Sequence, residues 1–223
     1  MSVPSIVRPG PDRESTVTGL LDEYRLFAKL IGALDASDWT RETRCARWQV
    51  RDVAGHVVGQ AVDTVTGALG SRTPDDQAVA LRGESSTALA TQLHAAVDSL
   101  AGIAAAFDGA VWSAPSPVPG LTIGQGVHAL RHDAYMHGDD IRAALGLPFD
   151  TGPGLGASLD FVLGALLRDE AAAALPAIAR LLALPADHFS EQTGIAERDF
   201  LLAATGRGDP ASLSLPDLVN IYR

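Results

Sequence analysis

Four segments of roughly 20 residues carry apolar side chains at helical spacing, and breaks that contain glycine or proline separate them. They lie at about 15–34, 50–69, 86–107 and 122–146. Aromatic residues make up only 5% of the chain, whereas alanine, which has the highest helix propensity, lies in long tracts. The sequence therefore predicts an all-α fold built on a four-helix bundle, because four helices of this length can bury their apolar faces together.

The helical segments become shorter after the break LPFDTGPG, which covers residues 147–154. They lie at about 156–172, 175–184 and 197–205. We expect residues 1–150 to form the bundle with the candidate site, and residues 151–223 to form a small C-terminal helical subdomain. The single cysteine, Cys45, excludes an intrachain disulfide.

The net charge of −10 disfavours two classes of partner. Lysine and arginine are scattered along the chain, so nucleic acid and anionic membrane surfaces would be repelled. The first residues lack the apolar stretch of a signal peptide, and the most apolar stretch, 171–186, contains two prolines and an arginine. We expect a cytoplasmic protein that acts on small molecules. Whether it forms a homodimer stays open.

The segment 122–146 is the most informative for function. Its inward-facing positions, four and three residues apart, are expected to be Ile123, Val127, Leu130, Ala134, His137, Ile141 and Ala144. His137 thus takes a place where an apolar side chain is expected, and Asp133 lies one turn before it. Two polar groups that point into a bundle are costly unless they are paired. A metal ion would pair them. The alternative is an Asp–His hydrogen bond that only orients a core histidine.

A second pair of histidines in the same segment, His128 and His132, has the i, i+4 spacing of helical zinc motifs. At about 100° per residue, however, His132 lies about 140° around the helix from His137, and His128 about 180°. We therefore expect this pair to face outwards or to lie at a boundary, and not to hold the metal.

The segment 50–69 supplies a third candidate ligand, His56, between Gly55 and Gly59. A glycine inside a helix costs about 1 kcal/mol relative to alanine. Two of them beside one histidine indicate that another segment approaches closely or that a cavity is left open. A core histidine is the alternative. Two histidines and one carboxylate suit a divalent metal, zinc first and nickel or ferrous iron next, and three protein ligands leave a position open for substrate.

Three stretches of the chain carry a resemblance to a known family. WQVRDVAGHVVG, RHDAYMHGDDIRAALG and FLLAATGRGDP followed by NIYR resemble the mycothiol-dependent maleylpyruvate isomerase family, whose bundle belongs to the DinB-like metalloprotein superfamily. The resemblance implies a metal site at His56, Asp133 and His137. It also places Arg207 at the edge of the active site, as a catalytic residue, and implies mycothiol as the co-substrate. For Arg207 the alternative is a solvated cation after a helix C-terminus.

The chain departs from this family in two places. The isomerase has glutamate where this chain has Asp133, and a carboxylate one methylene shorter requires the ion to shift or the helices to lie closer. The C-terminal domain of the isomerase is mixed α/β, whereas residues 155–196 show no strand pattern. The resemblance therefore predicts the metal site more firmly than the isomerase reaction.

The hypothesis for function follows from these residues. A low-molecular-weight thiol would use the metal for isomerisation or S-transfer on a small electrophile that bears a carboxylate. Arg207 and Arg142 could hold the thiol or the carboxylate, although Arg142 could instead form an ion pair with a nearby aspartate. Cys45 is a poor candidate for the nucleophile, and the nearby Trp48 is expected to be a packing anchor. The rival hypothesis is a bundle that binds a metal or a small molecule without turnover.

Overall fold

The computed structural model describes residue 8 and residues 10–222. These residues form eleven α-helices and three short 3₁₀ turns, and they contain no β-strand, only two isolated bridges. The all-α prediction is confirmed. The expectation about a signal peptide concerns the first residues, and most of these lie outside the described residues. In the described part, no helix is long and apolar enough to cross a membrane.

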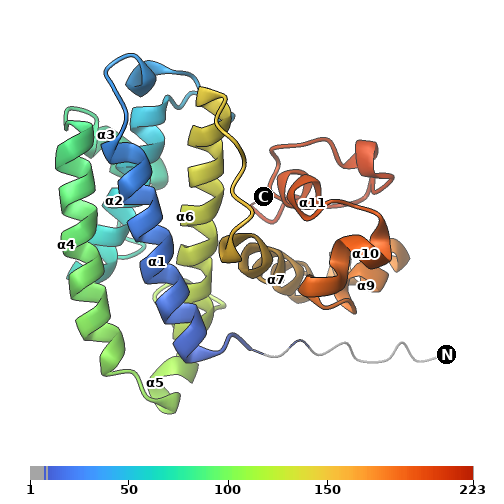
Figure 1. Ribbon diagram of the computed structural model, residues 1–223. Coiled ribbons are helices and arrows are strands. Elements are labelled where there is room, and N and C mark those ends of the chain that lie inside the picture. The colour runs from blue at the N-terminus through green and yellow to red at the C-terminus, as the bar shows by residue number, and fades with distance from the viewer. Residues whose placement is uncertain (1–7, 9, 223) are drawn as a thin grey trace. The chain divides into compact units, whose positions relative to one another are not determined.

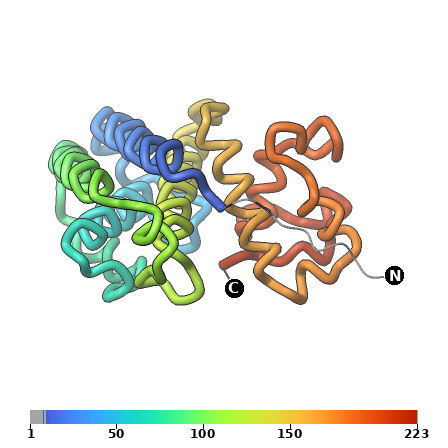
Figure 2. The backbone as a smooth tube through the Cα atoms, turned by 90° about the horizontal axis from the view of Figure 1, so that it is seen from below, coloured from blue at the N-terminus to red at the C-terminus, as the bar shows by residue number. Residues whose placement is uncertain are grey.

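The described residues form two compact units. The first is the helical bundle, Pro11–Asp150. Its helices are α1 (Arg13–Gly32), α2 (Val50–Thr66), α3 (Pro74–Leu81), α4 (Ser86–Ala105), α5 (Gly109–Ser113) and α6 (Ile123–Leu145). Each of α1 and α2 packs against both α4 and α6 (Figure 1). Figure 2 looks along these four long helices, which surround one apolar core of leucine, valine, alanine and isoleucine side chains.

The ends of α6 follow from its flanking residues. Thr122 is the N-cap, and its hydroxyl accepts a hydrogen bond from Gln125 N at 3.2 Å. Gly146 follows the helix at a φ of 67°, a left-handed conformation that favours glycine. At the inward-facing positions, Leu130, Ala134, His137 and Ile141 are buried, while the flanking Ile123, Val127 and Ala144 are half-buried.

Helices α3 and α5 lie where the sequence analysis placed breaks. Pro74 lies in one of these breaks, but it occupies the first turn of α3, where its missing N–H costs nothing. Helices of eight and five residues are not stable alone, so packing must stabilise them, and α3 packs along α2. Sequence periodicity cannot register so short a segment.

The second unit begins at Thr151 and includes Arg8. It contains α7 (Pro153–Arg168), α8 (Glu170–Ala173), α9 (Pro176–Leu182), α10 (Phe189–Thr193) and α11 (Glu197–Ala204). Its core includes Leu163 and the contacting rings of Phe189 and Phe200, with centroids 4.8 Å apart. Arg8 donates hydrogen bonds to the carbonyl oxygens of Leu182 and Leu184, at 3.1 and 2.8 Å.

Glu23 is a buried carboxylic acid on α1, 8% exposed. Burial raises the pKa of Glu23 to about 7, from an ordinary value of 4.5, against the opposing charge of Arg131. Asp150 and Asp22 act in the same direction as burial, and Arg142 opposes it. The folded state therefore favours the protonated acid, and the stabilising effect is lost as the pH rises from about 4.5 through 7.

We expect the Glu23→Gln variant to lose this pH dependence. In the wild-type protein, ionisation of Glu23 should lower the free energy of unfolding by about 3 kcal/mol between pH 4.5 and pH 8. Urea unfolding measured across that range should show a shallower decline in the variant, and greater stability than wild type at pH 8. Glu14→Gln, at an exposed position of the same helix, is the control. Parallel pH profiles for wild type and Glu23→Gln would contradict the prediction.

Candidate metal centre

His56 of α2 and the pair Asp133 and His137 of α6 lie close together inside the bundle. The Nε2 atom of His56 lies 3.2 Å from Asp133 Oδ2, and the Nε2 atom of His137 lies 3.6 Å from Asp133 Oδ1. The two imidazole rings have centroids 5.0 Å apart and meet edge to face. Each residue offers one ligand atom, and these three atoms lie within 4.8 Å of one another. The structure thus brings together the three residues that the sequence analysis selected.

The side chain behind His56 holds its ring in place. Gln77, which is buried on α3, accepts a hydrogen bond through Oε1 from His56 Nδ1 at 2.8 Å. The Gln77 amide is oriented by Asp63, whose Oδ2 accepts a hydrogen bond from Nε2 at 2.7 Å, and Asp63 also pairs with Arg72. This chain of contacts assigns the proton of His56 to Nδ1, so the Nε2 lone pair faces Asp133.

The glycines beside His56 are explained by the same helix. A Cβ atom at Gly59 would lie 2.9 Å from Gln77 Cβ, and one at Gly55 would lie 3.2 Å from the Ala78 carbonyl oxygen. Because neither glycine has a side chain, α3 can pack directly on α2. This packing brings Gln77 to the imidazole of His56. Of the two explanations that the sequence left open, a close approach or a cavity, the structure shows the close approach.

His137 has a comparable support on its other ring nitrogen. Its Nδ1 atom lies 3.0 Å from Oδ2 of Asp140, which is fully buried. Asp140 also pairs with Arg44 at 3.0 Å, and the guanidinium of Arg44 contacts Asp139 at 2.6 Å. The buried carboxylate is therefore balanced by a cation, and it directs the Nε2 atom of His137 towards Asp133.

The pKa of Asp133 is shifted by its neighbours in the site. Burial alone would raise the pKa of Asp133, but the neighbouring His137 and His56 outweigh burial and hold the pKa below its ordinary value. Its Oδ2 atom is buried and faces His56 Nε2 at 3.2 Å. The protons of both imidazoles are engaged on Nδ1, so an ionised carboxylate that faces both Nε2 atoms fits a bound cation better than a hydrogen-bonded core histidine.

Two aromatic residues complete the surroundings. The ring of Trp48 lies against both histidines, with centroid distances of 5.3 Å to His56 and 6.0 Å to His137. Tyr24 of α1 is completely buried, and its hydroxyl has no hydrogen-bond partner in the described part of the chain. Burial, reinforced by the Asp133 carboxylate, raises the pKa of the Tyr24 hydroxyl, so it stays protonated.

Cys45 lies beside the site and forms a second group that could hold a metal, with His137 and Asp140. Its Sγ atom lies 3.8 Å from His137 Nδ1 and donates to Asp140 Oδ2 at 3.1 Å. Asp140 is already engaged by Arg44, so this group has less capacity for a cation than the first. The sequence analysis considered Cys45 only as a poor candidate for the nucleophile and did not place it at the centre.

The expectation for His132 was wrong. The sequence analysis placed His132 outwards or at a boundary, but it is 1% exposed, whereas His128 is half-buried. The middle of α6 is buried around much of its circumference, because Tyr135, Met136 and Asp139 are buried as well as the inward-facing positions. The rule that one face of a bundle helix meets solvent therefore fails there.

The two arginines that were assigned to substrate or thiol binding stay predictions. Arg142 lies on α6, and its Nη2 atom is 3.6 Å from Asp150 Oδ2, the ion pair that was its alternative interpretation. Arg207 belongs to the second unit, after α11, where its Nη1 atom lies 3.5 Å from the Thr205 carbonyl oxygen.

The signals for the supporting residues were weak in the sequence. Gln77 lies on a helix that periodicity did not detect, and Asp140 has the common i, i+3 spacing from His137. Only the pair of glycines around His56 indicated that another segment packs there.

Fold and site together define a class of protein: a helical bundle with two histidines and an aspartate directed at one point in its interior. A family model described as the mycothiol maleylpyruvate isomerase N-terminal domain matches residues 20–142, more than half of the chain. The chain belongs to this family. No curated protein and no solved structure is detectably similar to it.

Proposed function

We propose that this protein is a metal-dependent enzyme that uses a low-molecular-weight thiol, such as mycothiol, to transform a small electrophile. The observation that carries the proposal is the Asp133 carboxylate, whose two oxygen atoms face the Nε2 atoms of His56 and His137 at 3.2 and 3.6 Å. Membership in the mycothiol maleylpyruvate isomerase family supports the choice of thiol.

The donor set fits a divalent cation of intermediate softness. Two imidazole nitrogens and one carboxylate oxygen suit zinc best, with nickel or ferrous iron as alternatives. When bound, the cation supplies a Lewis acid that lowers the pKa of a thiol that coordinates it. His56, Asp133 and His137 would be its only protein ligands, which leaves room for a thiol.

The chain's own residues would prepare this centre for a reactant. Gln77 and Asp140 hold the Nδ1 protons, so both histidines present Nε2 without rotating. The indole of Trp48 lies against the two imidazoles and would limit the entry of water. The Tyr24 hydroxyl keeps its proton and can donate a hydrogen bond to an oxygen or sulfur atom that approaches Asp133.

Two reactions fit a thiol nucleophile. For isomerisation, the sulfur bonds to one carbon of an activated double bond, and the electron pair moves towards the activating carbonyl group. After rotation about the resulting single bond, the carbon–sulfur bond breaks, the double bond returns and the thiol is released. With an electrophile that carries a leaving group, the sulfur displaces it and remains attached. Arg142 or Arg207 would hold a substrate carboxylate, and in the case of Arg142 that carboxylate would replace Asp150.

A panel of thiols tests the proposal. We expect zinc-loaded protein to isomerise maleylpyruvate, or to consume a reactive electrophile such as chlorodinitrobenzene, with mycothiol and only slowly with glutathione. His137→Ala should lower the rate by at least about a hundredfold, because metal catalysis contributes several kcal/mol. Stoichiometric metal binding without turnover of any thiol would contradict the proposal and would favour a non-catalytic metal-binding bundle.

A further inference from the structure

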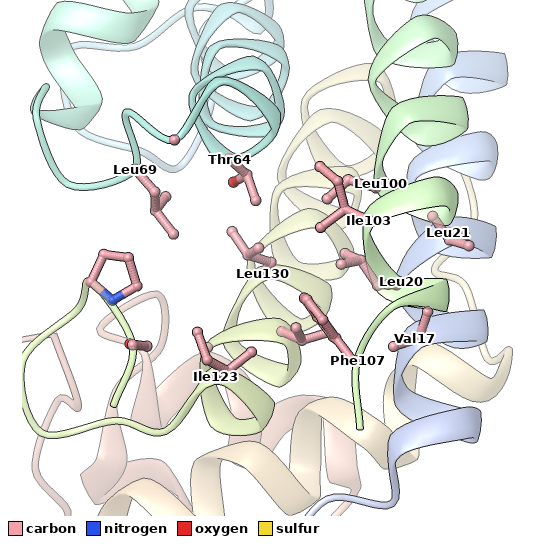
Figure 3. Close-up of a pocket in the computed structure, with 16 residues that line it drawn as sticks. Val17, Leu20, Leu21, Thr64, Leu69, Leu100, Ile103, Phe107, Ile123 and Leu130 are labelled. Atoms are coloured by element: carbon pink, nitrogen blue, oxygen red, sulfur yellow. The ribbon is translucent and has the colours of Figure 1, made fainter. Parts of the chain in front are cut away.

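A second feature of the bundle lies apart from the candidate metal centre. At the end where α1 and α6 begin and α2 and α4 end, side chains from all four helices surround a cavity of about 170 Å³ (Figure 3). Most of the side chains that line it are aliphatic, and they include Val17, Leu20, Leu69, Leu100, Ile123 and Leu130.

The cavity offers a ligand almost no polar surface. Thr64 and Ser116 carry the only side-chain hydroxyl groups in its lining, and no lining residue is charged. The Thr64 hydroxyl donates to the Gln60 carbonyl oxygen at 2.8 Å, and the Ser116 hydroxyl donates to the Val118 carbonyl oxygen at 2.9 Å. A charged or strongly polar molecule would lose its hydration without compensation, and a water molecule would lack the two to four polar partners it needs.

The cavity is open at one end. Ile103, near the end of α4, is 41% exposed at the cavity lining, whereas Leu20, Leu100 and Leu130 are buried. A small ligand could therefore enter between half-exposed side chains without unfolding the bundle. A sealed packing defect would have no such entrance.

We propose that this cavity binds one uncharged hydrocarbon group of about the size of a benzene ring or a short alkyl chain. Its volume is close to the roughly 150 Å³ at which an apolar cavity in another protein takes up benzene. The assignment goes beyond the proposed function and does not rest on it, because none of His56, Asp133 and His137 lines the cavity. Leu130, which lines the cavity, lies three residues before Asp133, about one helical turn along α6.

Titration of the full chain with benzene, followed by methyl NMR, tests the proposal. We expect saturable binding of one benzene per chain, with chemical shift changes at Leu130, Leu100 and Ile103. Benzoate, which has the same ring and a charge, should cause none of these changes. The Ala104→Phe variant places a ring in the cavity and should lose benzene binding, whereas Ala105→Phe, at the exposed neighbouring position, should retain it.

A second substitution keeps the test decisive if Ala104→Phe does not fold. Val127→Phe fills the same cavity from α6 and should also lose benzene binding. Benzene binding that persists in a folded filling variant, or no saturable binding by wild type, overturns the proposal. So does sedimentation evidence that a second copy of the chain covers the entrance. His137→Ala should bind benzene as wild type does, so a failure here is distinct from a failure of the metal site.

Discussion

The His56→Ala variant is expected to purify without the metal that the wild-type protein retains. Zinc-loaded wild type should carry about one metal ion per chain. If binding energy on the order of 10–16 kcal/mol is shared among three protein ligands, the loss of one costs about 4 kcal/mol. That loss raises the dissociation constant for the metal roughly a thousandfold. His137→Ala should behave in the same way. Elemental analysis after dialysis against a weak chelator measures the metal content directly.

Cys45→Ala is the matched control for this experiment. The two groups that could hold a metal share His137, but His56 belongs only to the first and Cys45 only to the second. We expect Cys45→Ala to keep its metal, and His128→Ala, on the same helix as His137, to keep it as well. Stoichiometric metal in His56→Ala, together with loss from Cys45→Ala, would move the site to the second group. Metal retained by both His56→Ala and His137→Ala would remove both assignments.

The Asp140→Ala variant is expected to lose both stability and metal affinity. Asp140 is fully buried and paired with Arg44, and removal of one partner of a buried ion pair costs about 3–5 kcal/mol. His137 would also lose the carboxylate that holds its Nδ1 proton, which should weaken metal binding about 10- to 100-fold. Urea unfolding measures the first effect, and competition with a fluorescent zinc chelator measures the second.

Asp139→Ala separates the two effects. Asp139 is also buried and also pairs with Arg44, at 2.6 Å, but the contact with His137 is made by its neighbour. We expect a comparable loss of stability in Asp139→Ala. Its zinc affinity should stay within about threefold of wild type, because Asp140 and not Asp139 holds the ring of His137. Equal losses of zinc affinity in the two variants would show that Asp140 acts through general stability and not as a positioning residue for His137.

The long helices could be predicted from the sequence, because they depend on local signals. The long helices α1, α2, α4 and α6 were each expected within a few residues of their observed ends, because apolar spacing, the Thr122 cap and the Gly146 terminus are local signals. The pairing of Asp133 with His137 was also local, since one helical turn fixes it. Helix α3 was missed, because an eight-residue helix with a proline in its first turn is stabilised by packing on α2 and not by its own pattern.

The supporting residues needed contacts between segments far apart in the chain. Cys45 and Arg44 precede α2 and contact Asp140 of α6. Gln77 lies on α3 and contacts His56 of α2. Cys45 lies 92 positions from His137, and Gln77 lies 21 positions from His56. Helical periodicity does not relate residues so far apart, so neither contact could be predicted from the sequence. Nor does the sequence indicate that the buried Tyr24 hydroxyl, which has no hydrogen-bond partner in the described part of the chain, interacts electrostatically with Asp133.

By itself, the sequence determined that this chain folds into helices and that polar residues interrupt the apolar face of one of them. Those properties depend on neighbours within about four residues, the range over which helical geometry acts. The tertiary structure alone decided that His56 faces Asp133 across the bundle, that His132 is buried, and that an apolar cavity lies at the end of the helices. Each of these depends on how separate helices pack, and packing is a property of surfaces that the linear order does not contain.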